Sequence, residues 1–296
     1  MTLPSNIRTY LSIALILLAA LIIFLDEPGF SWIEVQFALF IWVATFLTRS
    51  ASTRIGIFHW AVGAGFSVLL LLLLGNIFKW TGVNPETVFM KAVILPLFEE
   101  ILKILPVILA VFFLYKKRKL TLNPSTLLFL GVMSAVGFSM VEKSYWENIS
   151  FPFTYGPHIG NYHFFSDALG IWVRSKPMGF IGHGAATGLI AMGIGLGISL
   201  KKTRTFCSIW WIFPIFTSAW ILAEHMLLNL YYANGSTALL LLGGGMLTPW
   251  IFLLFLAAVL WTDMKNTIRA YRLSPKLKDR FFRLFRYFKS RRSKIR

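Results

Sequence analysis

The chain has 296 residues, of which 57% are hydrophobic and only 14% are charged, and its mean hydropathy is +0.69. These values exclude an ordinary soluble domain and indicate a chain that lies largely in a lipid bilayer. The formal net charge of +17 does not indicate nucleic-acid binding, because the basic residues gather in alternate connections between apolar segments. The single cysteine, Cys207, excludes an intramolecular disulfide and a cysteine-rich metal site.

Eight apolar segments are long enough to cross a bilayer, whose hydrocarbon core requires about 20 residues of helix. They lie at about residues 7–25, 30–48, 57–78, 88–115, 125–146, 177–200, 206–232 and 237–262. The first segment ends in Phe24, Leu25 and Asp26 without a small-residue cleavage site, so we expect it to be a retained helix. The sequence therefore predicts an all-α, polytopic membrane bundle of about eight transmembrane helices within residues 1–264.

Basic residues mark the connections that would share one side of the membrane. They are Arg8, Arg49, Arg54, Lys116, Lys117, Arg118, Lys119, Lys201, Lys202, Arg204 and those of the tail from Lys265 onward. Cytoplasmic connections of membrane proteins are enriched in Lys and Arg. Eight spans with both termini in the cytoplasm satisfy this pattern in every connection.

The C-terminal tail, residues 265–296, contains thirteen Lys and Arg residues and one acidic residue. Its apolar side chains repeat on one helical face. They are Leu277, Phe281, Leu284, Phe285 and Phe288, so three of the five are phenylalanines. A basic amphipathic helix of this kind binds the anionic lipid of an inner leaflet. We therefore expect the tail to lie on the membrane surface and not to bind nucleic acid.

Four of the predicted spans contain ionisable side chains, which are unfavourable by several kcal/mol inside a bilayer and so indicate function. They are Glu99, Glu100, Lys103, Glu142, His183 and His225, and Asn229 follows His225 by one helical turn. Counting about 1.5 Å per residue puts the glutamate pair roughly 17 Å from the outer end of its span, and His183 about 9 Å below the outer end of segment 177–200. We expect these groups to meet in the outer half of the bilayer.

Carboxylates and imidazoles at one level form a set that can activate water, because Glu accepts a proton and His ligates a metal or stabilises an oxyanion. Glu99, Glu100, Glu142, His183 and His225 are the catalytic candidates. Lys103 lies one turn after Glu99 and is the expected counter-charge for it. In the simplest geometry that pairing leaves Glu100 as the general base, although either glutamate remains open.

Structural roles and other functions are also open. In one alternative, Glu99 and Lys103 form a buried structural salt bridge. In another, Glu142 pairs with Lys143 at a helix end. In a third, His225 and Asn229 join helices by hydrogen bonds. Intramembrane Glu, Lys and His also mark ion pathways, so a proton-coupled transporter or channel is an alternative function. The second alternative function is that of a non-catalytic membrane partner protein. The agreement in depth among four spans favours an active site.

The order of these residues resembles the PrsW family of intramembrane proteases, which are related to the CAAX prenyl endopeptidases in a glutamate-based membrane protease clan. The resemblance covers roughly residues 88–232. It rests on Glu-Glu-x-x-Lys at 99–103, Gly-Phe-x-x-x-Glu at 137–142, His183, and His-x-x-x-Asn at 225–229. Lys143 and Trp146 differ from the usual Asn and Tyr of the family.

The resemblance implies hydrolysis of a peptide bond in a membrane-associated protein, in the bacterial cytoplasmic membrane. A glutamate of the Glu99 and Glu100 pair would activate water with assistance from His183 and His225, and Lys103 and Asn229 would support them. Relatives are classed as metallopeptidases, so Zn²⁺ held by Glu142, His183 and His225 is the implied cofactor, while a metal-free mechanism stays open. The implied substrate is similar to an anti-sigma factor cut on its outer side.

Overall fold

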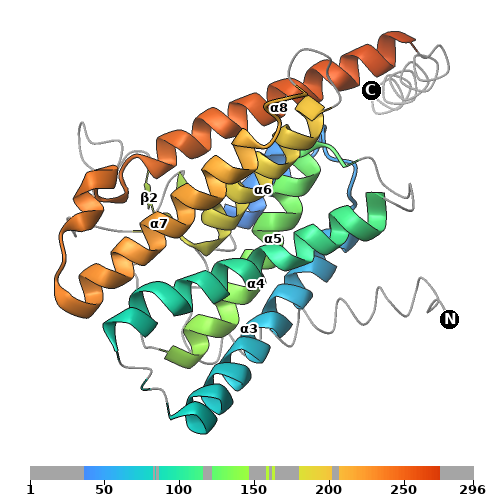
Figure 1. Ribbon diagram of the computed structural model, residues 1–296. Coiled ribbons are helices and arrows are strands. Elements are labelled where there is room, and N and C mark those ends of the chain that lie inside the picture. The colour runs from blue at the N-terminus through green and yellow to red at the C-terminus, as the bar shows by residue number, and fades with distance from the viewer. Residues whose placement is uncertain are drawn as a thin grey trace, which may run out of the picture.

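The computed structural model describes residues 37–82, 84, 87–115, 122–146, 158–159, 162–163, 180–201 and 207–273. These residues are helical apart from turns, short connections and two strands of two residues, β1 (His158–Ile159) and β2 (Tyr162–His163), which pair antiparallel. The helical segments are residues 37–44, α3 (Thr53–Thr81), η1 (Met90–Ile94), α4 (Leu95–Ala110), η2 (Val111–Tyr115), α5 (Pro124–Trp146), α6 (His183–Lys201), α7 (Ile212–Asn234), η3 (Ala238–Gly245) and α8 (Thr248–Leu273) (Figure 1). The prediction of an all-α fold is confirmed.

Five helices of the described part are long and apolar enough to cross a membrane: α3, α5, α6, α7 and α8. The predicted span 88–115 is also a run of helical backbone, formed by η1, α4 and η2, but it carries four charged residues. The predicted span 7–25 lies outside the described residues, and the span 30–48 is described only from residue 37. Most of the predicted tail, residues 274–296, also lies outside them.

Three predicted spans begin later than hydropathy indicates. The span predicted from residue 206 begins at Ile212, and glycines with positive φ explain the other two differences. The helix predicted from residue 177 begins at His183, directly after Gly182, whose φ is 97°. His183 is therefore the first residue of α6 and not, as expected, an interior residue of a longer helix. The helix predicted from residue 237 begins at Thr248, because Gly243, Gly244 and Gly245 have φ values of 72°, 63° and 85° and interrupt a regular helix.

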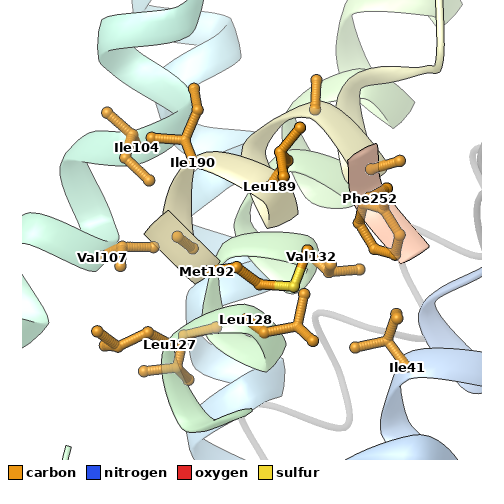
Figure 2. Packing of buried hydrophobic residues seen from close by; sticks show 14 of the residues in the cluster. Ile41, Ile104, Val107, Leu127, Leu128, Val132, Leu189, Ile190, Met192 and Phe252 are labelled. Atoms are coloured by element: carbon orange, nitrogen blue, oxygen red, sulfur yellow. The ribbon is translucent and has the colours of Figure 1, made fainter. Parts of the chain in front are cut away.

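The centre of the bundle is formed by α5 and α6, which lie between α3 and α4 on one side and α7 and α8 on the other (Figure 1). Of the residues in their apolar stretches, 83% in α5 and 78% in α6 are buried, compared with 33%, 28% and 22% in α3, α7 and α8. The buried cluster joins Val107 of α4, Val132 of α5, Leu189 of α6 and Phe252 of α8 (Figure 2). The outer helices carry large exposed apolar side chains, such as Leu72 of α3, Ile215 of α7 and Leu254 of α8.

Glycines bring α3 and α5 into backbone contact. A Cβ atom added to Gly63 would lie 1.9 Å from the carbonyl oxygen of Ser134, and one added to Gly137 would lie 2.0 Å from that of Trp60. Each helix therefore presents a glycine to the backbone of the other, an arrangement that allows very close helix packing in membranes. This contact holds α5, and with it Glu142, against α3.

A buried carboxylate joins α8 to the start of α5. Asp263 is 1% exposed and accepts a hydrogen bond of 2.7 Å from the backbone N–H of Ser125. The first N–H groups of a helix lack partners within it, and the N-terminus attracts negative charge. Asp263 therefore caps α5 from a neighbouring helix and fixes the position of the central pair relative to α8.

Candidate active site

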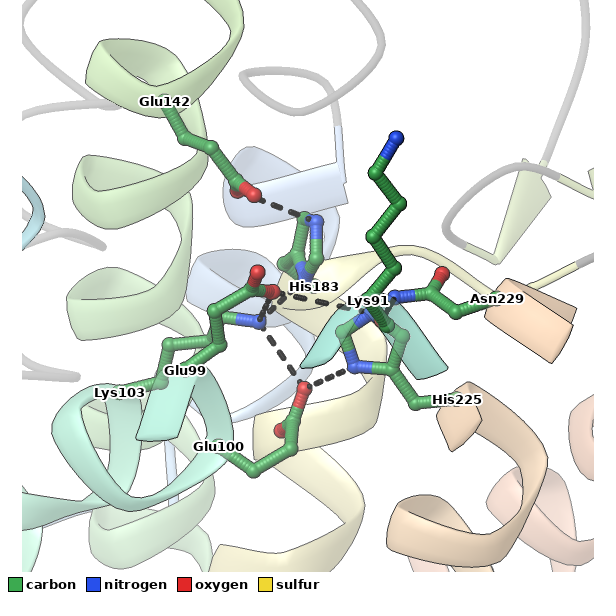
Figure 3. Close-up of polar contacts among 8 residues, drawn as sticks. All are labelled: Lys91, Glu99, Glu100, Lys103, Glu142, His183, His225 and Asn229. Atoms are coloured by element: carbon green, nitrogen blue, oxygen red, sulfur yellow. Dashed lines mark hydrogen bonds and ion pairs between the residues drawn. The ribbon is translucent and has the colours of Figure 1, made fainter. Parts of the chain in front are cut away.

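The six ionisable side chains singled out in the sequence lie in one cluster, where four helices meet (Figure 3). Glu99, Glu100 and Lys103 come from α4, Glu142 from α5, His183 from the first residue of α6, and His225 from α7. Pro96 stands at the start of α4 and Pro106 within it, so one proline lies on each side of the two glutamates in the chain. The described fold thus gathers polar groups that are 126 positions apart in the chain, from 99 to 225.

Lys103 lies at the centre of the cluster and is fully buried. Its Nζ atom is 2.9 Å from Glu100 Oε1, 3.4 Å from Glu99 Oε2 and 2.6 Å from His183 Nδ1. An ammonium group has three N–H donors and no acceptor, so these three contacts use its whole donor capacity. Lys103 therefore connects α4 to α6 as well as neutralising charge within α4.

The expected pairing of Lys103 with Glu99 is present at 3.4 Å, but the expectation that it leaves Glu100 uncommitted is wrong. Glu100 lies nearer to the ammonium than Glu99 does, and its Oε1 atom also accepts a hydrogen bond from His225 Nδ1 at 2.9 Å. Positions i+3 and i+4 both face residue i on a helix, so spacing alone does not choose between the two glutamates. Glu100 turns into the bundle, where it is 5% exposed.

The ring of His225 lies between the two glutamates. Its Nδ1–H donates to Glu100, because a carboxylate oxygen only accepts, and its Nε2 atom is 3.6 Å from Glu99 Oε2. A neutral imidazole that donates through Nδ1 carries a lone pair on Nε2. That lone pair faces Glu99, so His225 can take a proton on the side of this glutamate.

His183 connects Lys103 to Glu142. Because the Lys103 ammonium only donates, His183 Nδ1 accepts, and a neutral ring then carries its proton on Nε2. The Nε2 atom faces Glu142 Oε2 at a distance of 3.3 Å. The side chains of Glu142, Glu99 and His183 are 18%, 12% and 11% exposed, compared with 6% for both Glu100 and His225. The side of the cluster that carries Glu142 and Glu99 is therefore the more exposed one, and we call it the open side.

Glu99, Glu142 and His183 form a group that can hold a metal ion, since one ligand atom of each lies within 4.8 Å of the others. This group differs from the expected ligand set in one member, with Glu99 in place of His225. Two carboxylates and one imidazole match the three protein ligands of a catalytic zinc site in number and type. Coordination by His183 and its bond to Lys103 exclude each other, because a neutral imidazole has one lone pair. The residues fit a metal ion once Lys103 withdraws from His183.

Two residues at the cluster were missed in the sequence. Phe180 is buried, stacks on the His225 ring with 4.7 Å between centroids, and meets His183 edge-on at 5.4 Å. Ser134 of α5 donates a hydrogen bond of 2.8 Å to the carbonyl oxygen of Lys103. No signal in the sequence could have found Phe180, which is one phenylalanine among 28.

A bundle of membrane helices that buries carboxylates, imidazoles and an ammonium at one meeting point has the architecture of an intramembrane hydrolase. The chain belongs to the PrsW family of intramembrane metalloproteases, because the model of that family, described as "PrsW family intramembrane metalloprotease", matches residues 50–262. The match includes every residue of the cluster and confirms the resemblance found in the sequence. Membership identifies an integral membrane protein of a protease family. Comparisons with curated proteins and with solved structures produced no match.

Proposed function

We propose that the protein hydrolyses a peptide bond of a membrane-associated protein substrate, with Glu99 as the general base. The observation that carries this proposal is the group formed by Glu99, Glu142 and His183, whose ligand atoms lie within 4.8 Å of one another on the open side of the cluster. Glu100 is less suited to the role, because its Oε1 atom already receives bonds from both Lys103 and His225. A general base must reach the proton of water within hydrogen-bonding distance.

The two histidines assist Glu99 from opposite sides. His225 Nε2 faces the Glu99 carboxylate, so it can take up the proton that Glu99 removes from water and return it to the leaving amine. His183 directs Nε2 toward Glu142 on the open side, where a substrate carbonyl would arrive. Lys103 and Glu100 hold these rings in place. The proposed role of each histidine follows from the carboxylate that its Nε2 atom faces.

The metal of this site is proposed to be Zn²⁺, held by Glu99, Glu142 and His183 when Lys103 is not bonded to His183. Glu99 would bind the ion through one carboxylate oxygen and accept the proton of water with the other. The donor set supports this assignment, because carboxylate oxygen and imidazole nitrogen are both zinc ligands. Bound there, the ion would supply Lewis acidity that polarises a carbonyl group and favours ionisation of water. Lys103 supplies a positive charge at the same place when it binds His183 and Glu99.

The topology and substrate class are proposed on the charge pattern and the family. Eight spans with both termini in the cytoplasm would put Glu142, near the C-terminal end of α5, and His183, at the start of α6, toward the outer face. The substrate would then be similar to an anti-sigma factor cut on its outer side, in the bacterial cytoplasmic membrane. The basic tail would bind anionic lipid on the inner leaflet.

Glu99→Gln tests the general base. We expect purified E99Q to lose roughly 10²- to 10⁴-fold in kcat, because an amide of the same shape cannot accept the proton. Glu224→Gln is a matched control: Glu224 is buried in α7 and accepts a hydrogen bond from Thr248 at the start of α8, so E224Q should retain activity. The proposal is wrong if protein with glutamine at both positions 99 and 100 cleaves a membrane substrate at the wild-type rate.

Removal of metal tests the zinc assignment. We expect protein stripped with a chelator, with the loss of metal checked by elemental analysis, to lose activity and to recover it when Zn²⁺ is added. Glu142→Gln should require more Zn²⁺ for recovery, because an amide is a weaker ligand than a carboxylate. If stripped protein cleaves as fast as untreated protein, the zinc assignment is wrong and the role of Glu99 stands by itself.

A further inference from the structure

Asn229 lies one helical turn after His225 on α7, yet its amide bonds to backbone and not to the acidic side chains. The Asn229 Nδ2 group donates a hydrogen bond of 3.1 Å to the carbonyl oxygen of Lys91, which lies in η1 directly before α4 (Figure 3). A side-chain amide that bonds a helix carbonyl of another segment is unusual, because such carbonyls are ordinarily used within their own helix. The local structure around Lys91 explains why this one accepts.

The Lys91 carbonyl loses the two helical donors that follow it. In an α-helix its donor would be the N–H of Leu95, four residues on, but that N–H bonds to the oxygen of Met90, because η1 is wound as a π-helix. Five residues on stands Pro96, which has no N–H. The wide turn and the proline together direct the Lys91 oxygen to a donor outside the helix, and Asn229 supplies that donor.

Two hydrogen bonds therefore join α7 to the segment that carries both glutamates. The first is Asn229 to the Lys91 oxygen, and the second is His225 to Glu100 at 2.9 Å. Asn229 and His225 are four residues apart, so both point from the same face of α7. With both contacts made, α7 has one longitudinal position relative to α4, and in that position the His225 ring lies between Glu99 and Glu100.

We propose that Asn229 is a positioning residue for His225, and that Pro96 makes this possible by leaving the Lys91 carbonyl to the Asn229 amide. The inference rests on the proposed proteolytic function only for its activity readout. Asn229 acts through the backbone of η1 and the placement of α7. The identity of the side chain at position 91 does not matter to this contact, whereas the absence of an N–H at position 96 does.

A double-mutant cycle between Asn229 and Pro96 tests the inference. We expect Asn229→Ala to lower kcat about tenfold with little change in KM in the wild-type background, which corresponds to the loss of one buried hydrogen bond. In the Pro96→Ala background the restored N–H can serve the turn that contains Lys91, so Asn229→Ala should then lower kcat less than about threefold. Pro96→Ala alone should lower kcat about as much as Asn229→Ala does, because the restored N–H competes with the Asn229 amide for the Lys91 carbonyl.

Two controls separate this coupling from general damage. Pro106→Ala also restores an N–H in α4, but far from Lys91, so Asn229→Ala should lower kcat about tenfold in that background too. Asn76→Ala removes an amide that bonds Leu72 within α3 at 2.7 Å, and its effect should be small and independent of Pro96. Pro96→Ser restores the same N–H and serves as a second background if Pro96→Ala does not accumulate.

The outcomes distinguish this inference from the proposed function. An equal loss of kcat on Asn229→Ala in the wild-type and Pro96→Ala backgrounds overturns the inference, since an amide that contacts substrate acts independently of Pro96. If the protein shows no proteolysis, the same cycle is measured by thermal unfolding in detergent. Asn229→Ala must then lower Tm more in the wild-type background than in the Pro96→Ala background, and equal shifts again overturn the inference.

Discussion

Lys103 is a fully buried ammonium whose three donors are used by Glu100, Glu99 and His183. Removing one member of a buried ionic cluster leaves the others without compensation, which destabilises proteins by about 3–5 kcal/mol. Arg is a poor substitute, because its donors form a planar fork and cannot converge on three separated acceptors as an ammonium does. The geometry therefore requires a lysine at this position.

Lys103→Met tests this requirement at the scale of one residue. We expect a lower Tm and at least an about tenfold lower activity, because two carboxylates and His183 lose their shared donor. Lys265→Met, at an exposed position of α8, is the matched control and should change stability by less than about 0.5 kcal/mol. Wild-type Tm and activity in K103M would contradict the central role of the ammonium.

The sequence was sufficient to select the members of the cluster but not their partners. Glu99, Glu100, Lys103, Glu142, His183 and His225 are conspicuous because charge is rare inside spans. The preference of Lys103 for Glu100 depends on side-chain rotation into the bundle, which spacing does not reveal. Phe180 has no such signal, since an aromatic residue is ordinary in a chain of this composition.

Between elements, the contact of α3 with α5 depends on backbone atoms and not on side chains that can rotate away. Gly63 and Gly65 are separated by one residue on α3 but differ in surroundings. A Cβ atom on Gly63 would lie 1.9 Å from the Ser134 oxygen, whereas one on Gly65 would meet nothing within 4 Å. The two glycines therefore form a matched pair for an experiment.

Gly63→Ala should destabilise the protein by about 1–3 kcal/mol or more, because the added methyl forces the two helix backbones apart. Gly65→Ala should be neutral or stabilising by up to about 1 kcal/mol, because alanine favours the helix and no neighbour obstructs it. Thermal unfolding of both variants in detergent micelles measures the difference. Equal Tm values for the two would show that α3 and α5 do not pack in this way.

The sequence predicted the existence of the helices better than their ends. Hydropathy extended α6 back to residue 177 and α8 back to residue 237, because the connecting residues are as apolar as the helices. The breaks come from backbone conformation at Gly182 and at Gly243, Gly244 and Gly245. A glycine is compatible with both a helix and a left-handed turn, so composition could not locate these boundaries.

For the whole molecule, the orientation in the membrane can be tested with the only native cysteine. Cys207 is exposed and precedes α7, and the proposed topology puts it in the cytoplasm. A membrane-impermeant thiol reagent should therefore label Cys207 in inverted vesicles and not in intact cells. Thr237→Cys in a Cys207→Ala background should show the reverse, because residue 237 lies exposed between α7 and α8. Labelling of both positions from one side would overturn the topology.

At this scale, loop charge predicts orientation and hydropathy predicts spans, but neither predicts which helices are central. The central position of α5 and α6 follows from their small residues, such as Gly131, Gly137 and Gly188, each of which lies against a neighbouring helix. Small residues in a span are compatible with packing and with flexibility alike. Only the assembled bundle shows which small residues serve helix packing.

The glycine contact between α3 and α5 also limits how this sequence can vary. A larger residue at Gly137 cannot be accommodated by a smaller side chain opposite, because the atom in the way is the backbone oxygen of Trp60, which every residue type possesses. Gly137 opens the Gly-Phe-x-x-x-Glu sequence that ends in Glu142. Among relatives with close-packed helices, we therefore expect this glycine to be present even where the glutamate has been replaced. The glycine of the motif is required for helix packing, whereas its glutamate belongs to the proposed active site.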